Sequence, residues 1–358
     1  MSEVTERIKE RIGAADLIGE YLKLERAGAN YRALCPFHNE KTPSFMVNPE
    51  RNFWYCFGCQ KGGDIFNFVQ DIEGLTFRET LTRLAERAGV ELPRWQNQEA
   101  EKEDKDQKKK LWQILEEATL FFQTQLEKSR QGAQVKKYLF ERGLTQEAVE
   151  VFRLGFIPAG WRHLLDFLLS RGHSLADIEA TGLLVKKEGG AAGDKTAHYD
   201  RFRERIIFPV ADYFGKVVGF SARVLPGGDE KSAKYINTPQ TAVYDKSQVL
   251  YGFYQAKSEI KKQDRVILAE GNMDIAASYS AGVKNIIAIS GTAFSRAQAQ
   301  SIKRLTSRVS LCLDMDQAGR KATEKTIKIC LENDLEVDVI SLPAGNKDIN
   351  DVVMRNRE

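Results

Sequence analysis

Residues 265–290 read RVILAEGNMDIAASYSAGVKNIIAIS, and this stretch decides the fold of the C-terminal part of the chain. Two short apolar runs, RVILAE and KNIIAIS, flank a stretch around residues 274–282 that has helical spacing. The alternation continues to residue 343, with strands expected at RVSLCLD and EVDVISLP and helices at 295–306 and 318–332. Alternating strands and helices predict an α/β domain with a parallel, doubly wound sheet.

Carboxylates follow these strands at the edge where sheet enzymes place catalytic groups. Glu270 closes the first strand, Asp314 and Asp316 close the third, and Asp348 follows the fourth. If the third segment is extended, its two carboxylates point to one side, about 6.5 Å apart along the chain. Clustered carboxylates need cations, and oxygen ligands suit Mg²⁺ or Mn²⁺, so the set predicts metal-dependent phosphoryl or nucleotidyl transfer. Capping of the following helix, above all by Asp316, is the alternative.

Upstream, two pairs of potential metal ligands lie seventeen residues apart. Cys35 and His38 form the first pair, and Cys56 and Cys59 form the second. A spacer of two residues lets both members of a pair reach one tetrahedral zinc ion. Because protein side chains would fill all four positions, the zinc is expected to be structural.

Basic and aromatic residues surround these ligands, and two interpretations of them stay open. They combine the side chains that bind a phosphate backbone with those that stack on unpaired bases, and they equally suit the packed core of a small zinc ribbon. The residues are Tyr31, Lys41, Arg51, Phe53, Trp54, Tyr55 and Phe57. Cys312 and Cys330 fall in apolar segments and are interpreted as buried thiols.

The middle of the chain combines helices with a β-hairpin. Residues 99–110, EAEKEDKDQKKK, are typical of a linker or an exposed helix start. Helical spacing follows, and ERIIFPVAD and GKVVGFSARVL then predict a β-hairpin, which makes this part α+β. Residues 186–262 hold 14 Lys and Arg against 9 Asp and Glu, although the whole chain carries only +3. This excess favours a polyanionic partner, and a solvated basic face is the alternative.

Composition bounds the class of protein. The 358 residues are 42% hydrophobic and 29% charged, which is typical of two or three folded domains. No run approaches the roughly 20 apolar residues of a membrane span, and the charged N-terminus does not resemble a signal peptide. We therefore expect a cytoplasmic protein without a membrane partner. The expected domains are a zinc-binding domain at 1–98, a charged linker at 99–113, a basic α+β subdomain at 114–262 and the catalytic subdomain at 263–358.

Glu270-Gly271-Asn272-Met273-Asp274, followed by Asp314-Met315-Asp316, resembles the Toprim domain of bacterial primases, type IA and type II topoisomerases and some nucleases. A zinc module, a basic α+β segment and Toprim, in that order, are similar to the bacterial replicative DNA primase family. Segments in the same order along nearly the whole chain support this resemblance. They include CPFHNEKTPSF, WYCFGCQKGGDIFNF, RFRERIIFP, GFSARVL, KYINTPQT, EGNMD and DMDQAGRKA.

The resemblance implies a set of functional residues. Glu270, Asp314 and Asp316 would carry catalytic Mg²⁺ or Mn²⁺, supported by Asp274 and Asp348. A basic ridge would bind template and nucleotide phosphates, and it comprises Arg201, Arg203, Arg223, Lys234, Tyr235, Asn237 and Lys246. The implied partners are a single-stranded DNA template, ribonucleoside triphosphates and the RNA primer product.

Two features depart from the family pattern. The family has a second acid two residues beyond Asp348, where this chain has Asn350, so a second metal is expected to bind more weakly or through Asp351. Family chains also continue into a helical subdomain and a domain that docks the replicative helicase, whereas this chain stops at Glu358. We therefore expect a fragment or a truncated version, without the helicase-docking domain.

The expected activity is synthesis of short RNA primers de novo on single-stranded DNA. Two other functions stay open. A Toprim nuclease or topoisomerase would cleave DNA, but a topoisomerase needs a nucleophilic tyrosine in a further domain. A non-catalytic DNA-binding module would retain the fold alone, and the intact Glu270, Asp314 and Asp316 argue against it.

Overall fold

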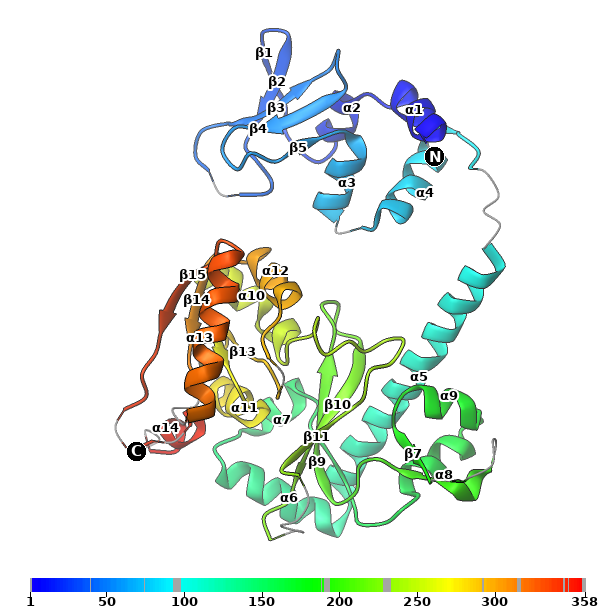
Figure 1. Ribbon diagram of the computed structural model, residues 1–358, viewed down its shortest axis with the longest axis vertical. Coiled ribbons are helices and arrows are strands. Elements are labelled where there is room, and N and C mark those ends of the chain that lie inside the picture. The colour runs from blue at the N-terminus through cyan, green and yellow to red at the C-terminus, as the bar shows by residue number, and fades with distance from the viewer. Residues whose placement is uncertain are drawn as a thin grey trace. The chain divides into compact units, whose positions relative to one another are not determined.

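The computed structural model describes residues 2–355 except 39, 74, 93–97, 188, 190–193, 228–232, 292, 314–316, 344 and 347. The chain divides into two compact units, residues 1–99 and 100–358, and each is described here by itself (Figure 1). No helix within the described residues is both long and apolar enough to cross a bilayer.

The first unit combines an antiparallel sheet with short helices. Over its described residues the strands pair in the order β1-β2-β3-β4-β5. In chain order the elements are α1 (Ser2–Arg11), α2 (Ala14–Gly19), β1 (Glu25–Ala27), β2 (Asn30–Ala33), β3 (Phe45–Asn48), β4 (Phe53–Cys56), β5 (Gly62–Gly63), α3 (Ile65–Glu73) and α4 (Phe77–Ala88).

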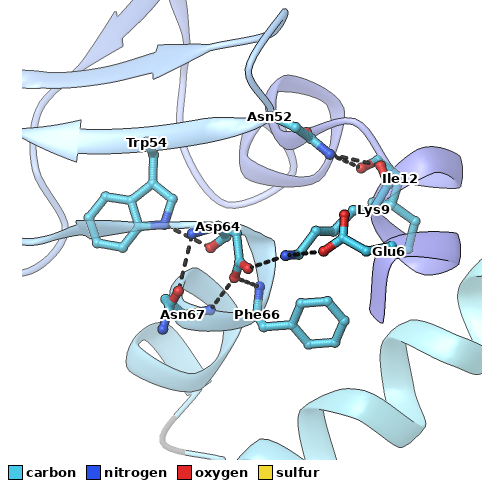
Figure 2. A network of polar contacts seen from close by, with 8 residues as sticks. All are labelled: Glu6, Lys9, Ile12, Asn52, Trp54, Asp64, Phe66 and Asn67. Atoms are coloured by element: carbon cyan, nitrogen blue, oxygen red, sulfur yellow. Dashed lines mark hydrogen bonds and ion pairs between the residues drawn. The ribbon is translucent and has the colours of Figure 1, made fainter. Parts of the chain in front are cut away.

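Asp64 joins three of these elements (Figure 2). Its side chain accepts hydrogen bonds from the Phe66 and Asn67 amides and therefore caps the N-terminus of α3. Its other carboxylate oxygen pairs with Lys9 of α1 at 2.9 Å, and its carbonyl accepts the indole hydrogen bond of Trp54 at 3.0 Å. One residue thus fixes α1 and α3 against β4.

Helix α4 is capped at its N-terminus and buries one of its faces. Thr76 caps it in a capping box with Glu79, and Leu81 and Leu84 are buried. Thr80 and Ala85 complete the buried stripe, whereas Phe77 is exposed. The Phe77 ring lies at the edge of the core, with its centroid 5.8 Å from that of the buried Phe66.

The second unit begins with helices and a mixed α+β region. Its elements up to residue 237 are α5 (Gln98–Lys128, which starts two residues before the unit), α6 (Arg130–Glu141), α7 (Gln146–Val151), β6 (Gly155–Ile157), α8 (His163–Ser170), α9 (Leu175–Ala180), β7 (Leu184–Lys186), a 3₁₀ turn at Lys195–Ala197, β8 (His198–Asp200), β9 (Arg205–Ala211), β10 (Val217–Val224) and β11 (Tyr235–Asn237). The charged run at 99–110 is helical, which is one of the two forms that its sequence left open. The expected domain boundaries themselves stay predictions.

Strands β9 and β10 pair antiparallel, which confirms the predicted hairpin. They are central in a sheet that has the order β11-β10-β9-β6 over the described residues. Ile207 and Phe220 pack with Phe122 of α5 on one face, and Phe208 packs with Met273 on the other. Burial on both faces explains why RIIFPV is a continuous apolar run.

The last part contains the predicted parallel sheet, in the order β13-β12-β14-β15 for the part of the chain that is described. The elements are α10 (Phe253–Gln263), β12 (Val266–Ala269), α11 (Asn272–Ser280), β13 (Ile286–Ala288), α12 (Arg296–Lys303), β14 (Arg308–Leu311), α13 (Gln317–Glu332), β15 (Glu336–Val339) and α14 (Ile349–Arg355). An isolated bridge between Tyr251 and Ala288 joins the loop before α10 to β13. Cys312 and Cys330 are buried, as expected.

Candidate metal centre and catalytic cavity

The ligand atoms of Cys35, His38, Cys56 and Cys59 all lie within 4.8 Å of one another. The two thiol sulfurs of Cys35 and Cys59 are 3.9 Å apart, and the Cys56 sulfur lies 3.8 Å from His38 Nδ1. A tetrahedral zinc ion with Zn–S bonds of about 2.3 Å separates its ligands by about 3.8 Å. These four residues therefore fit one structural zinc ion.

Glu40 supports this group and was not predicted from the sequence. Its carboxylate lies 3.1 Å from His38 Nε2, so it orients the ring with Nδ1 toward the cysteines. It also accepts hydrogen bonds from the amides of Cys35 and Ser44. Gly58 is required beside it, since a Cβ there would lie 2.5 Å from His38 Nε2.

Some of the aromatic and basic residues around the metal group are packed in the core, and others are exposed and available to nucleic acid. Trp54 is 1% exposed and stacks on Phe45 at 5.0 Å between ring centroids, so it belongs to the core. Phe53 and Phe57 are 41% and 71% exposed. Lys41 and Arg51 are also exposed, whereas Tyr31 and Tyr55 are partly buried.

In the second unit, a cavity of about 250 Å³ lies where the antiparallel sheet approaches α11. Seven of the residues implied by the resemblance line it, namely Arg223, Lys234, Tyr235, Asn237, Glu270, Asp274 and Asp348. These residues come from β10, β11, α11 and the segments beside them. The tertiary fold thus brings acidic and basic groups together around one cavity.

The acidic side of the cavity is built on the end of β12. Glu270 directly follows that strand, and Asp274 lies in the first turn of α11. Gly271 has an ordinary extended conformation, with φ of −107°, so the backbone conformation does not require a glycine here. The glycine is needed for space instead, because a Cβ there would lie 2.6 Å from the Asp274 carboxylate.

Asp314 and Asp316 lie outside the described residues. They follow β14 in the sequence, and β14 pairs in parallel with β12, with Leu311 opposite Leu268. Among the described residues, the carboxylates of this cavity do not by themselves form a group of three that could hold a metal ion. Glu270 and Asp348 are hard oxygen donors that face one cavity, which fits a divalent cation completed by further ligands.

The basic side of the cavity is formed by β10 and β11. The Arg223 guanidinium lies 5.8 Å from the Tyr235 ring centroid. Burial raises the pKa of Tyr235 to about 12, although Arg223 opposes the shift. Asn237 donates a hydrogen bond to the Ser290 carbonyl at 3.3 Å. Its own side-chain oxygen is buried and has no hydrogen-bond partner among the described residues, so it can accept a bond from a ligand.

Three residues of the expected basic ridge lie elsewhere. Arg201 donates to the carbonyls of Gly182 and Leu184, and burial lowers its pKa. Arg203 stacks on Trp161 and Tyr199, with 4.5 and 5.1 Å from its guanidinium carbon to the ring centroids. Lys246 does not line the cavity, and its carbonyl accepts a bond from Gln298.

Sequence reasoning missed several residues at the cavity. Arg142, at the end of α6, lines it, and its buried Nε has no hydrogen-bond partner among the described residues. Asn350 donates from its side chain to the Arg142 carbonyl and from its amide to Asp274. The buried Arg205 donates to the Ala233 carbonyl at 2.9 Å and so positions the segment before Lys234. Ser221, Asn272 and Ser290 also line the cavity.

Comparison with known families divides the chain into three matched regions. Residues 1–100 match the CHC2 zinc finger model, residues 121–257 the N-terminal domain of the DNA primase catalytic core, and residues 267–353 the Toprim-like model. Together these regions follow the order expected from the sequence.

Curated relatives and solved structures agree with these matches. The chain is 40% identical to the DNA primase of Halalkalibacterium halodurans over 96% of its own length and 36% identical to that of Listeria monocytogenes over 98%. It spans 56% and 55% of those two proteins, about half of each. The zinc-binding and RNA polymerase domains of Aquifex aeolicus primase share 32% identity and a TM-score of 0.62, covering 99% of this chain and 82% of that one.

Two further solved structures cover the second unit. The Escherichia coli primase catalytic core is 31% identical with a TM-score of 0.60, covering 68% of this chain and 76% of that one. A DnaG primase catalytic domain bound to single-stranded DNA is also 31% identical, with a TM-score of 0.61, covering 70% and 76%. The resemblance inferred from the sequence is therefore confirmed, and the chain belongs to the DnaG-type family of bacterial DNA primases.

Proposed function

We propose that this chain synthesises short RNA primers de novo on single-stranded DNA, by metal-dependent nucleotidyl transfer. The cavity that joins Glu270, Asp274 and Asp348 to Arg223 and Lys234 carries the proposal. Nucleotidyl transfer needs acidic ligands for a cation beside basic groups for a triphosphate. The match to the primase core and to Toprim supports the same reaction.

In this proposal Glu270, Asp314 and Asp316 hold Mg²⁺ or Mn²⁺. A bound divalent cation lowers the pKa of the attacking 3′-hydroxyl and neutralises charge on the leaving pyrophosphate. The pairing of β12 with β14 supports this ligand set, since the first acid directly follows β12 and the other two follow β14 in the sequence. Asp274 and Asp348 line the same cavity and, in this proposal, support the three metal ligands.

The basic wall holds the incoming ribonucleoside triphosphate. Arg223 and Arg142 present guanidinium groups, which form forked hydrogen bonds with phosphate, and the exposed Lys234 adds a point charge. Tyr235 keeps its proton at neutral pH, as tyrosines ordinarily do, and burial raises its pKa further, to about 12. It therefore acts as a neutral residue beside the nucleotide.

Template binding involves residues outside this cavity. Trp161 is 62% exposed, and Arg203 covers its ring, which gives a stacking platform next to a positive charge. Phe53 and Phe57 on the zinc-binding unit offer further exposed rings for unpaired template bases. Arg201 and Lys246, which the resemblance also implies, lie outside the cavity, and their role in binding the template or the nucleotide stays a prediction. The partners are single-stranded DNA, ribonucleoside triphosphates and the RNA product, and the proposed location is the cytoplasmic replication fork.

The test is incorporation of labelled ribonucleotides on single-stranded DNA without a primer, with Mg²⁺ or Mn²⁺. We expect short RNA products from the wild-type chain and none from Asp314→Asn. Retained DNA binding by the variant shows that it is folded. Absence of product from a zinc-loaded wild-type chain that binds DNA would contradict the proposal, and cleaved DNA in its place would favour a nuclease.

A further inference from the structure

The turn between β9 and β10 carries two exposed aromatic residues. Phe214 is 73% exposed and Tyr213 is 38% exposed. The turn itself is fixed by neighbouring residues, since the Asp212 side chain accepts hydrogen bonds from the amides of Phe214 and Lys216, and Gly215 adopts a φ of +90°. Turn geometry needs Asp and Gly here but no aromatic ring. Large exposed rings at this position therefore point to a ligand.

Neighbouring helices extend these rings into a larger surface. Tyr254 of α10 is 40% exposed, and its ring lies against Gly215, where a Cβ would approach it to 2.7 Å. Lys257 Nζ lies 4.3 Å from the Tyr254 ring centroid and 5.1 Å from that of Tyr213. Lys216 Nζ lies 4.1 Å from the ring centroid of Trp112 on α5. We call the set Trp112, Tyr213, Phe214, Lys216, Tyr254 and Lys257 the aromatic–lysine surface.

A second cavity, of about 620 Å³, adjoins this surface. Trp112 and Tyr213 belong to both, and Arg304 adds a positive charge to the cavity wall. The Trp112 indole N–H is buried and has no acceptor among the described residues, so it can donate to a ligand. The cavity is larger than the catalytic one and shares no lining residue with it in the part of the chain that is described.

Two acids line the second cavity, but local bonds already engage both carboxylates. Asp212 accepts the two amide bonds of the turn. Asp245 accepts bonds from Ser247 and Gln248, which lower its pKa. Lys216 and Lys257 on the adjoining surface and Arg304 in the cavity wall therefore present positive charge beside flat aromatic rings. Aromatic rings with adjacent cations are the combination that binds single strands without regard to sequence.

We propose that the aromatic–lysine surface and its cavity bind the single-stranded DNA template at a distance from the catalytic cavity. The inference rests on the proposed function, because the bound strand is the template of that reaction. Lys216, which directly precedes β10, and Arg223 on β10 are seven residues apart, about 23 Å at the rise of a strand. A stacked nucleotide advances about 3.4 Å, so about seven nucleotides separate the two sites.

The first test compares the affinity of full-length variants for a fluorescent 20-nucleotide oligothymidylate. Phe214→Ala combined with Tyr254→Ala should weaken binding by at least about 25-fold, because it removes two stacking rings and each stacked base contributes at least about fivefold to the affinity. Lys216→Gln combined with Lys257→Gln should flatten the dependence of log affinity on log salt by about 1.4, or about 0.7 for each charge removed. Phe140→Ala and Lys137→Gln, on exposed positions of α6, are the matched controls and should change neither quantity.

A second measurement uses the unaltered protein, so it does not depend on how the variants fold. Oligothymidylate that carries photoreactive bases should crosslink to Trp112, Phe214 or Tyr254. Crosslinks absent from these residues, together with unchanged affinity and salt dependence in the variants, would overturn the proposal and favour a protein partner. Neither assay requires RNA synthesis, so failure of this site and failure of the primase activity are distinguished.

Discussion

Single residues behind the zinc ligands determine how well the metal group is held. Glu40 orients His38 and accepts the Cys35 amide, so its charge and geometry act on two ligands together. We expect Glu40→Gln to lower zinc affinity about 10- to 100-fold, the range typical of residues that support metal ligands. Competition with a chromophoric chelator measures it, with the exposed Glu50→Gln as control. If both variants bind zinc as tightly as the wild type, Glu40 contributes to packing alone and not to zinc binding.

Lys234 tests whether the basic wall contacts phosphate. Its side chain is exposed at the catalytic cavity, so Lys234→Ala removes one charge without disturbing the core. We expect weaker single-strand binding and a salt dependence of log affinity that flattens by about 0.7. Lys187→Ala is the control, because Lys187 is exposed in the same basic segment but outside the cavity. An equal loss of affinity in Lys234→Ala and Lys187→Ala would show that binding depends on the overall charge of the segment and not on a phosphate contact at the cavity.

At the scale of the element, a buried carboxylate caps helix α8. Asp200 is fully buried and accepts bonds from the Leu164 and Leu165 amides, each at 2.9 Å. Burial raises its pKa to about 6, against the two amide bonds, which lower it. A carboxyl group with a raised pKa favours the folded state below its unfolded pKa of about 4, and this stability is lost as the pH rises through 6.

The unfolding free energy should therefore fall, through Asp200, by about 1 kcal/mol between pH 5 and 7.5. Asp200→Asn removes the titrating group, so the unfolding free energy of the variant should depend less on pH over this range than that of the wild type. The variant should also be less stable at every pH, because Asn caps the helix more weakly. Urea unfolding at both pH values measures the difference. Parallel pH profiles for the two proteins would contradict the raised pKa.

The sequence predicts elements and metal ligands whose residues lie close together along the chain. It does not predict contacts between segments that are far apart in the sequence. The four zinc ligands lie within 25 residues, and the β9–β10 hairpin is joined by a short turn, so their spacing is visible in the sequence. Arg142 carries no local sign of its role. It reaches the cavity because α6 packs near α14, and the sequence pattern around it predicts only a helix end.

Contacts that the sequence does not reveal also explain why only part of the predicted basic ridge lies at the cavity. Arg223 lies on β10 and Lys234 directly precedes β11, and the register of these two strands sets both at the cavity, since Arg223 lies opposite Tyr235. Arg201 follows β8, and two of its three guanidinium nitrogens donate to carbonyls of the chain. A basic residue in a sequence gives no indication of whether its hydrogen bonds are made internally or remain available for phosphate.

At the scale of the whole molecule, Asn350 joins α14 to the rest of the second unit. Its side chain is fully buried, and its bond to the Arg142 carbonyl is 2.6 Å long. Asn350→Ala should displace α14 and the adjoining Asp348, and a shift near 1 Å can cost up to about 100-fold in rate. We expect at least about tenfold slower primer synthesis with unchanged DNA affinity.

Asn333→Ala is the matched control for this change. It removes a comparable bond, from the Asn333 side chain to the Ile329 carbonyl, at the end of α13 and outside the cavity. Initial rates of dinucleotide synthesis and DNA affinities of both variants measure the effect. Equal rates in Asn350→Ala and Asn333→Ala would contradict a positioning role for Asn350.

The bond between Asn350 and Arg142 also has a consequence for the order in which the protein assembles during translation. Its two residues are 208 positions apart, so ribosomes that add about 5–20 residues per second need about 10–40 s between them. The zinc ligands, by contrast, emerge from the ribosome almost together. The nascent chain can therefore complete its metal-bound unit early, whereas the catalytic cavity gains its last wall only when synthesis has passed residue 350.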